Sequence, residues 1–133
     1  MIIKEGLNFK SQKLEYRHLN IQDATDEYVS WFENEDTKKF ILGASNFTNK
    51  EKLSEYINMH NNKEDSILIG VFRKGIHIGN IKYEPINFYA KTAWLGILIG
   101  RKENRSKGFG AEIIHATTKI LRDQLGIRTI RLG

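Results

Sequence analysis

Apolar residues recur at helical spacing in two stretches of the first half of the chain. The first stretch holds Tyr28, Trp31 and Phe32 after a predicted N-cap at Asp23, and its early acidic residues suit the positive end of a helix dipole. The second begins with the capping-box pair Thr48 and Glu51 and continues with Leu53, Tyr56, Ile57 and His60. Such spacing places one apolar face on each segment, which predicts two helices.

Alternating and fully apolar runs predict the strands of a sheet. Residues 14–19 alternate as an imperfect strand. Residues 66–73 are short and β-branched, and Lys74-Gly75 supplies a tight turn into residues 76–83, so these two runs should pair as an antiparallel hairpin. Residues 93–100 are nearly all apolar, which predicts burial on both faces and the most central place in the sheet.

The last part of the chain predicts a β-α-β unit over residues 93–132. Residues 111–125 carry an apolar stripe at helical spacing, and Gly126 stands where a left-handed C-cap ends a helix. Residues 127–132 predict a further strand, and the crossover between the two strands should be right-handed. Residues 1–133 therefore predict a single domain of mixed helices and strands.

Composition narrows the class of protein. The chain has no cysteine, and no apolar run approaches the roughly 18 residues of a membrane-spanning helix. No secretory signal is visible, so we expect a soluble, cytoplasmic protein with no membrane partner. Residues 101–133 hold 8 Lys or Arg and 3 Asp or Glu, whereas residues 1–100 hold 13 of each. This local excess suggests either an anionic ligand or a solvated helix face.

The segment Arg105-Ser106-Lys107-Gly108-Phe109-Gly110-Ala111 lies between a predicted buried strand and a predicted helix. Its glycines let a ligand approach the backbone, and the first amides of the helix lack intrahelical acceptors, so a pyrophosphate is the natural occupant. A P-loop is excluded because Lys107 precedes its glycine. A dinucleotide fingerprint is excluded because Ile113 stands where the third glycine belongs.

Arg105, Gly108 and Gly110 satisfy the pattern [Q/R]-x-x-G-x-[G/A], which resembles the coenzyme A signature of the GNAT superfamily of N-acetyltransferases. Residues 94–100 resemble the central strand of that family and residues 111–125 the helix that follows it. Residues 14–20 and 28–34 resemble the opening of bacterial ribosomal-protein and amino-sugar acetyltransferases. The resemblance implies a mixed, mostly antiparallel sheet flanked by helices, within the α/β (α+β) class.

The resemblance also implies a ligand and a reaction. Acetyl-coenzyme A would place its pyrophosphate on the backbone of residues 105–111 and its pantetheine arm along Ile97, Leu98 and Ile99. A β-bulge eased by Gly96 or Gly100 would open the cleft. A neutral primary amine of a small molecule, an amino sugar or a peptide amino terminus would then attack the thioester, with backbone amides stabilising the oxyanion.

The general base has no obvious candidate, since residues 92–100 contain no carboxylate. Glu84, just after the neighbouring predicted strand of residues 76–83, is the first candidate, and His77 and Tyr83 are weaker candidates that more often pack in a sheet. His18, His60 and His115 show no ligand spacing with one another, so we expect no metal site.

In the family, a helix that bears the leaving-group acid and two more strands follow residues 127–132. The resemblance therefore implies that this chain is incomplete at its carboxyl end, that it transfers acetyl groups poorly by itself, and that its exposed sheet edge favours a homodimer. Two alternatives stay open. One is a catalytically silent domain that binds acyl-coenzyme A. The other is a basic nucleic-acid-binding module, which we do not expect because residues 127–132 lack the aromatics of an RNA-binding strand.

Overall fold

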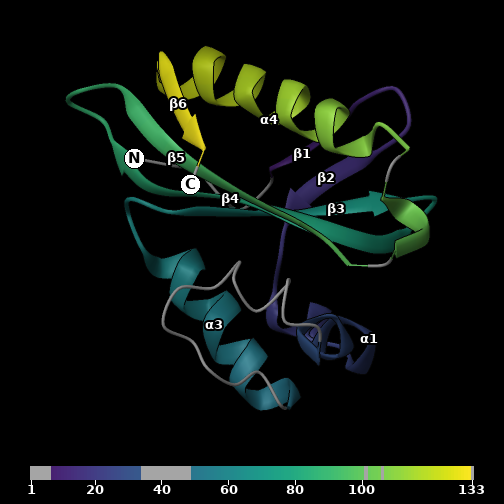
Figure 1. The fold of residues 1–133 in the computed structure, drawn as a ribbon. Coiled ribbons are helices and arrows are strands. Elements are labelled where there is room, and N and C mark those ends of the chain that lie inside the picture. The colour runs from purple at the N-terminus through teal and green to yellow at the C-terminus, as the bar shows by residue number, and fades with distance from the viewer. Residues whose placement is uncertain (1–6, 34–48, 101, 106, 133) are drawn as a thin grey trace.

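The computed structural model describes residues 7–33, 49–100, 102–105 and 107–132. Its core is a six-stranded sheet in the order β1-β2-β3-β4-β5-β6, with helices on both faces (Figure 1). The strands are β1 (Asn8–Lys10), β2 (Glu15–His18), β3 (Ile67–Arg73), β4 (Ile76–Asn87), β5 (Thr92–Ile99) and β6 (Thr129–Leu132). The helices are α1 (Asp26–Ser30), α3 (Lys50–Asn62) and α4 (Phe109–Leu125), with 3-10 turns η1 (Ile21–Asp23), η2 (Trp31–Glu33) and η3 (Lys102–Asn104).

Neighbouring strands run antiparallel except β5 and β6, which are parallel and joined through α4. This arrangement confirms the predicted fold class, the hairpin of β3 with β4, and the β-α-β unit. Gly126 ends α4 in the left-handed conformation, at φ 70°, as its position predicts. β1 was absent from the sequence-based prediction.

Two apolar layers hold the helices on the sheet. On one face, Ile113 and Leu121 of α4 are fully buried, and the hydroxyl groups of Tyr83 and Thr117 lie 2.7 Å apart between β4 and α4. On the other face, α1 and α3 bury the residues Tyr28, Trp31, Leu53, Ile57 and Leu68. Because side chains alternate across a strand, β3 supplies both layers, whereas β4 supplies apolar residues to the α4 face and polar residues to the face of α1 and α3.

Both predicted helix starts in the first half are wrong by a small shift. The N-cap of α1 is Thr25 rather than Asp23, since the Thr25 side chain accepts from the amide of Tyr28 at 3.2 Å. The N-cap of α3 is Asn49, whose side chain accepts from the amide of Lys52 at 2.8 Å. Thr48 lies outside the described residues. Asn, Asp and Thr side chains can all accept a hydrogen bond from an amide of the first turn. Neighbouring residues of these types are therefore alternative N-caps, and the sequence alone does not choose between them.

The prediction that β5 is the most central strand, buried on both faces, is wrong, because β3 and β4 stand in the middle of the sheet order. Six of the seven residues of β3 are buried, whereas Trp94 of β5 is 43% exposed. The bulge expected at Gly96 or Gly100 is also misplaced, because the register of β4 with β5 is regular from Gly79 to Tyr83 and shifts between Tyr83 and Ile86. The irregularity contains Pro85, which has no N–H to donate to a ladder.

Asp23 gives a pH-dependent prediction for this framework. Burial raises the pKa of its carboxyl, but hydrogen bonds from Arg17 at 2.8 Å and from the amide of Asn20 at 2.9 Å outweigh burial, so the net pKa is lowered. A carboxyl with a lowered folded-state pKa stabilises the fold above its unfolded pKa of about 3.9, and that contribution is lost as the pH falls through the folded-state pKa.

Asp23→Asn should therefore lower the free energy of unfolding by about 1 kcal/mol at neutral pH, since the bound Arg17 is itself partly exposed. The difference from the parent should shrink as the pH falls below about 4. Urea unfolding at several pH values measures it. Asp26→Asn, at an 89% exposed side chain, is the control and should change stability less. An unchanged difference across this range would contradict the assignment.

Candidate active site

The glycine loop joins β5 to α4 and carries the predicted anion site. Gly108 adopts φ 78°, a left-handed conformation that favours glycine, and no side-chain hydrogen bond caps the first turn of α4. A Cβ added at Gly110 would meet nothing within 4 Å. The structure thus places the described residues of the 105–111 segment at the start of α4, as expected, while Ser106 lies outside the described residues.

Charges around this helix start favour an anion. The carboxylate of Glu112, in the first turn of α4, accepts hydrogen bonds from the amide of Lys13 at 2.7 Å and from the hydroxyl of Ser11, so it is engaged with the β1–β2 turn. Arg73, at the end of β3, has its guanidinium carbon 5.2 Å from the ring centroid of Phe109. Arg73 lies far from the glycine loop along the chain, so the sequence alone does not indicate that its positive charge is near the loop.

The outer edge of β5, meaning the backbone of residues 96–99 on the side away from β4, is the second part of the site. β6 pairs with β5 only from Thr92 to Leu95, so no described strand pairs with this edge. The amide of Gly100 donates to the carbonyl of Ile78 at 2.8 Å. Since hydrogen bonding alternates along an antiparallel pair, Ile97 and Ile99 direct their backbone groups outward, whereas Leu98 faces β4.

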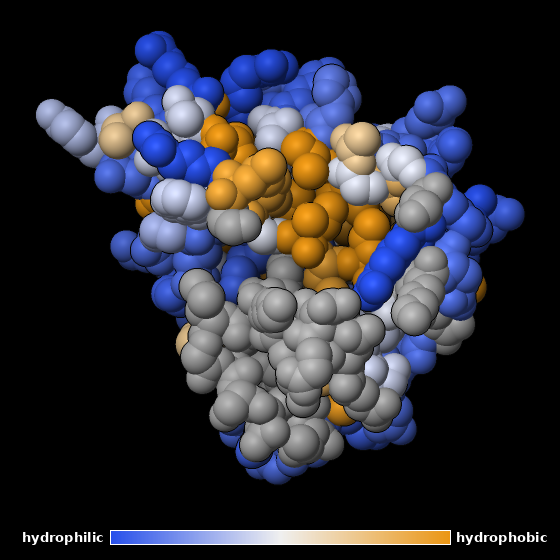
Figure 2. All heavy atoms as spheres, viewed as in Figure 1, coloured by the Kyte–Doolittle hydropathy of each residue, from blue (hydrophilic) through white to orange (hydrophobic). Residues whose placement is uncertain are grey.

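These two features fit an acyl-coenzyme A. A helix start with exposed amides and adjacent glycines suits a pyrophosphate, and an outward-facing strand backbone suits the amide groups of a pantetheine arm. Apolar side chains gather between α4 and β5, next to β6 (Figure 2). The partly buried apolar residues of these elements include Ile97, Ile99, Ile114 and Ile130.

Glu84 lies on the opposite face of the sheet from α4, within contact of α3. Its carboxylate accepts a hydrogen bond from Nζ of Lys63 at 2.8 Å and lies 2.8 Å from Nδ1 of His60. The same nitrogen lies 2.7 Å from the hydroxyl of the buried Ser66. Burial raises the pKa of Glu84, but hydrogen bonds from Lys63 and Ser66 outweigh it and lower the net pKa. The carboxylate is therefore ionised and fixed at neutral pH.

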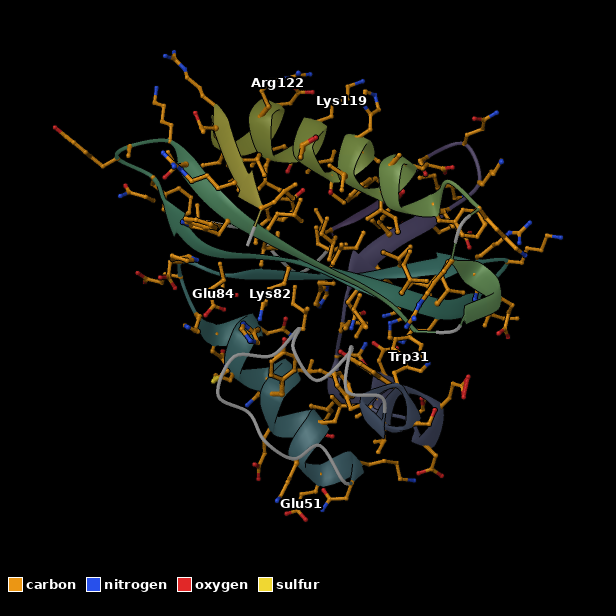
Figure 3. All side chains as sticks on the ribbon, viewed as in Figure 1. Trp31, Glu51, Lys82, Glu84, Lys119 and Arg122 are labelled. Carbon is orange, nitrogen blue, oxygen red and sulfur yellow. The ribbon has the colours of Figure 1, made fainter. Side chains whose placement is uncertain are left out.

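Lys82 shares this face of β4 with Glu84 (Figure 3), and sequence reasoning missed it. It pairs in register with Gly96, where the outer edge of β5 begins. Its Nζ lies 5.8 Å from the ring centroid of Tyr56, and burial lowers its pKa.

The two weaker base candidates have packing roles. His77 contacts the rings of Tyr28, Trp31 and Phe72, its Nε2 lies 2.7 Å from Oδ1 of Asn80, and burial lowers its pKa. Tyr83 points toward α4, away from the face of Glu84, and burial raises its pKa to about 12.

The described part of the chain shows neither a group of metal-binding side chains nor a helix that could cross a membrane. Across the described residues, no three His, Cys, Asp or Glu side chains are grouped closely enough to hold a metal ion. No described helix has the length and apolar character needed to cross a membrane.

Lys119 and Arg122 lie on the outer side of α4 in Figure 3, so part of the basic excess of residues 101–133 forms a solvated helix face.

Comparison with known proteins places the chain in a family. Residues 13–132 match the family described as "Acetyltransferase (GNAT) domain". No curated protein sequence matches the chain. A ribosomal-protein-S5-alanine acetyltransferase from Vibrio fischeri is similar in structure, with a TM-score of 0.77 at 15% identity, over 95% of this chain and 73% of that one.

Two further solved structures share the fold. A spermidine N-acetyltransferase chimera from Vibrio cholerae and hSSAT has a TM-score of 0.75 at 20% identity, over 91% of this chain and 70% of that one. The microcin C7 self immunity acetyltransferase MccE, in complex with acetyl-CoA and AMP, has a TM-score of 0.72 at 16% identity, over 88% and 66%. Since the family match spans most of its length, this chain belongs to the GNAT family, as its residues implied, and is an acyl-CoA-dependent N-acetyltransferase.

Proposed function

We propose that this protein binds acetyl-coenzyme A across the glycine loop and the outer edge of β5, and acetylates the primary amine of a small molecule, an amino sugar or a peptide amino terminus. One observation carries the proposal. The helix start that suits a pyrophosphate and the strand edge that suits a pantetheine arm are joined by one short loop, residues 100–108. A single ligand that has both groups can therefore bind both features.

Each part of the chain has a role in this proposal. The amides at the start of α4 bind the pyrophosphate, with Lys107 and Arg73 adding positive charge nearby. The backbone of Ile97 and the amide of Ile99 hold the pantetheine arm. When bound, acetyl-coenzyme A supplies the activated acyl group.

We assign Glu84 as the group that accepts the proton of the acceptor amine through a water molecule. It lies two residues from Lys82, on the same face of β4, and Lys82 pairs in register with Gly96 at the start of the outer edge. Its contacts with Lys63 and His60 keep the carboxylate ionised and oriented. Neighbouring folds include a spermidine and a ribosomal-protein acetyltransferase, which supports an amine or peptide acceptor here.

Calorimetry should show that acetyl-coenzyme A binds the parent protein, and thermal stability should rise as the ligand exceeds its Kd. Gly110→Asp should weaken binding by about tenfold or more, because a carboxylate in the open space at Gly110 would face the pyrophosphate. Asn58→Asp adds the same charge at an exposed position of α3 and should bind like the parent. Equal affinity in Gly110→Asp and the parent would remove the loop from the site.

Glu84→Gln should lower kcat by at least about tenfold while the affinity for acetyl-coenzyme A stays near that of the parent. Suitable acceptors are spermidine and a peptide with an amino-terminal alanine. Glu51→Gln, at the far end of α3 in Figure 3, is the matched control. An unchanged kcat in Glu84→Gln would exclude Glu84 as the base. Binding of acetyl-coenzyme A without turnover of either acceptor would favour a domain that binds acyl-coenzyme A without catalysis.

We also propose that two copies of the chain associate through β6. This strand ends the sheet order in the described part of the chain, and Leu132 is 70% exposed. A strand edge with exposed apolar residues recruits other strands. Light scattering at low micromolar concentration should give a mass above 15.4 kDa that falls toward it on dilution and in Leu132→Lys. A parent mass near 15.4 kDa at every concentration would refute the association.

A further inference from the structure

The side chain of Arg105, the first residue of the glycine pattern, turns back to the strand that precedes the loop. Its Nε and Nη2 donate to the carbonyl oxygen of Ile99, at 3.2 and 3.1 Å. A forked contact of a guanidinium with one carbonyl holds both the distance and the direction of the side chain. Arg105 thus joins the loop between β5 and α4 (Figure 1) to the end of β5.

The carbonyl that Arg105 binds belongs to the outer edge of β5. Ile99 precedes Gly100, whose amide is bonded to Ile78 of β4, so the Ile99 carbonyl points away from β4. Arg105 contacts this acceptor. The outward groups of this edge that Arg105 does not contact are the backbone of Ile97 and the amide of Ile99.

Gly100, which follows the Ile99 carbonyl that Arg105 contacts, is held in place by its neighbours. The indole of Trp31 packs directly on Gly100, so that a Cβ added there would overlap the ring. The hydrogen bond from Gly100 to Ile78 holds the same residue to β4. The end of β5 is thus packed from the side of α1 and bonded to its neighbouring strand, while Arg105 joins the loop to it from the outer edge.

We propose that Arg105 is a positioning residue, which sets the spacing between the amides of the glycine loop and the outer edge of β5 so that both can bind one acyl-coenzyme A. The inference rests on the proposed function. Two contacts on one ligand reinforce each other only when their separation matches that ligand, and a fixed separation removes an ordering cost on binding. The role belongs to the hydrogen bonds of Arg105 to Ile99 rather than to its charge.

Two variants separate the hydrogen bonds from the charge. Arg105→Gln places an amide nitrogen at the position of Nε along the side chain, so it keeps a donor for the Ile99 carbonyl and loses the charge. Arg105→Met removes both. Arg122→Gln, at an exposed position on α4, is the control for loss of an arginine charge. Circular dichroism and thermal melting check that each variant is folded.

Calorimetry with two ligands tests the role. Coenzyme A reaches both the loop and the strand, whereas adenosine 3′-phosphate 5′-diphosphate carries the pyrophosphate and reaches only the loop. Arg105→Met should bind coenzyme A about tenfold or more weakly, and should bind the nucleotide within about threefold of the parent. Arg105→Gln and Arg122→Gln should bind both ligands within about threefold of the parent.

The outcomes separate the two proposals. If Arg105→Gln and Arg105→Met lose affinity for both ligands alike, the guanidinium contacts phosphate and the positioning role is wrong. If every variant binds coenzyme A like the parent, the positioning role is also wrong, while the proposed function stands. If the folded parent binds neither ligand, the proposed function itself fails, and the inference fails with it. Should Arg105→Met not fold, Arg105→Leu replaces it as the variant that lacks a donor for the Ile99 carbonyl, with the same expected result.

Discussion

Every backbone N–H and C=O in a sheet needs a partner, and β5 meets this need in different ways along its length. Toward β4 it is paired from Thr92 to Ile99, with one irregularity near Pro85. On its other side, β6 pairs with its first half only, and Arg105 takes the Ile99 carbonyl at its end. The groups left between these two partners lie where the proposed ligand would pair, so the ladder of β5 defines the position of the site.

The two faces of the sheet carry different kinds of side chain. The α4 face is mainly apolar and fixes the helix whose start is the proposed anion site, with Tyr83 and Thr117 sharing a buried hydrogen bond. The face of α1 and α3 carries the polar side chains of β4, among them Asn80, Lys82 and Glu84. Because consecutive residues of a strand point to opposite faces, β4 both supports α4 and carries the side chains to which we assign the proposed chemistry.

Local patterns explain why much of the fold was predictable. The stripe of residues 111–125 and the glycine at 126 define α4 without help from the rest of the chain. Lys74 and Gly75 both adopt positive φ, at 52° and 81°, as a tight hairpin turn requires. The glycine loop was visible for the same reason, since its residues are consecutive.

What the sequence left undetermined depends on contacts between distant segments. Arg73 lies beside Phe109, and Glu84 contacts Lys63 and His60. These contacts join different elements, so no local pattern in the sequence predicts them. β1 has three residues, too few for a periodic signal. The burial of β3 rather than β5 follows from its place in the sheet order, which composition does not specify.

The contact between Trp31 and Gly100 has a consequence for how this domain diverges. The indole occupies the volume that any side chain at Gly100 would need, and the backbone there is held by β4. A relative that gains a side chain at this position keeps its packing only by exchanging the tryptophan for a smaller residue. The two positions, far apart in the sequence, should therefore be inherited as a pair, and their joint substitution would mark a lineage in which the end of β5 has been rebuilt.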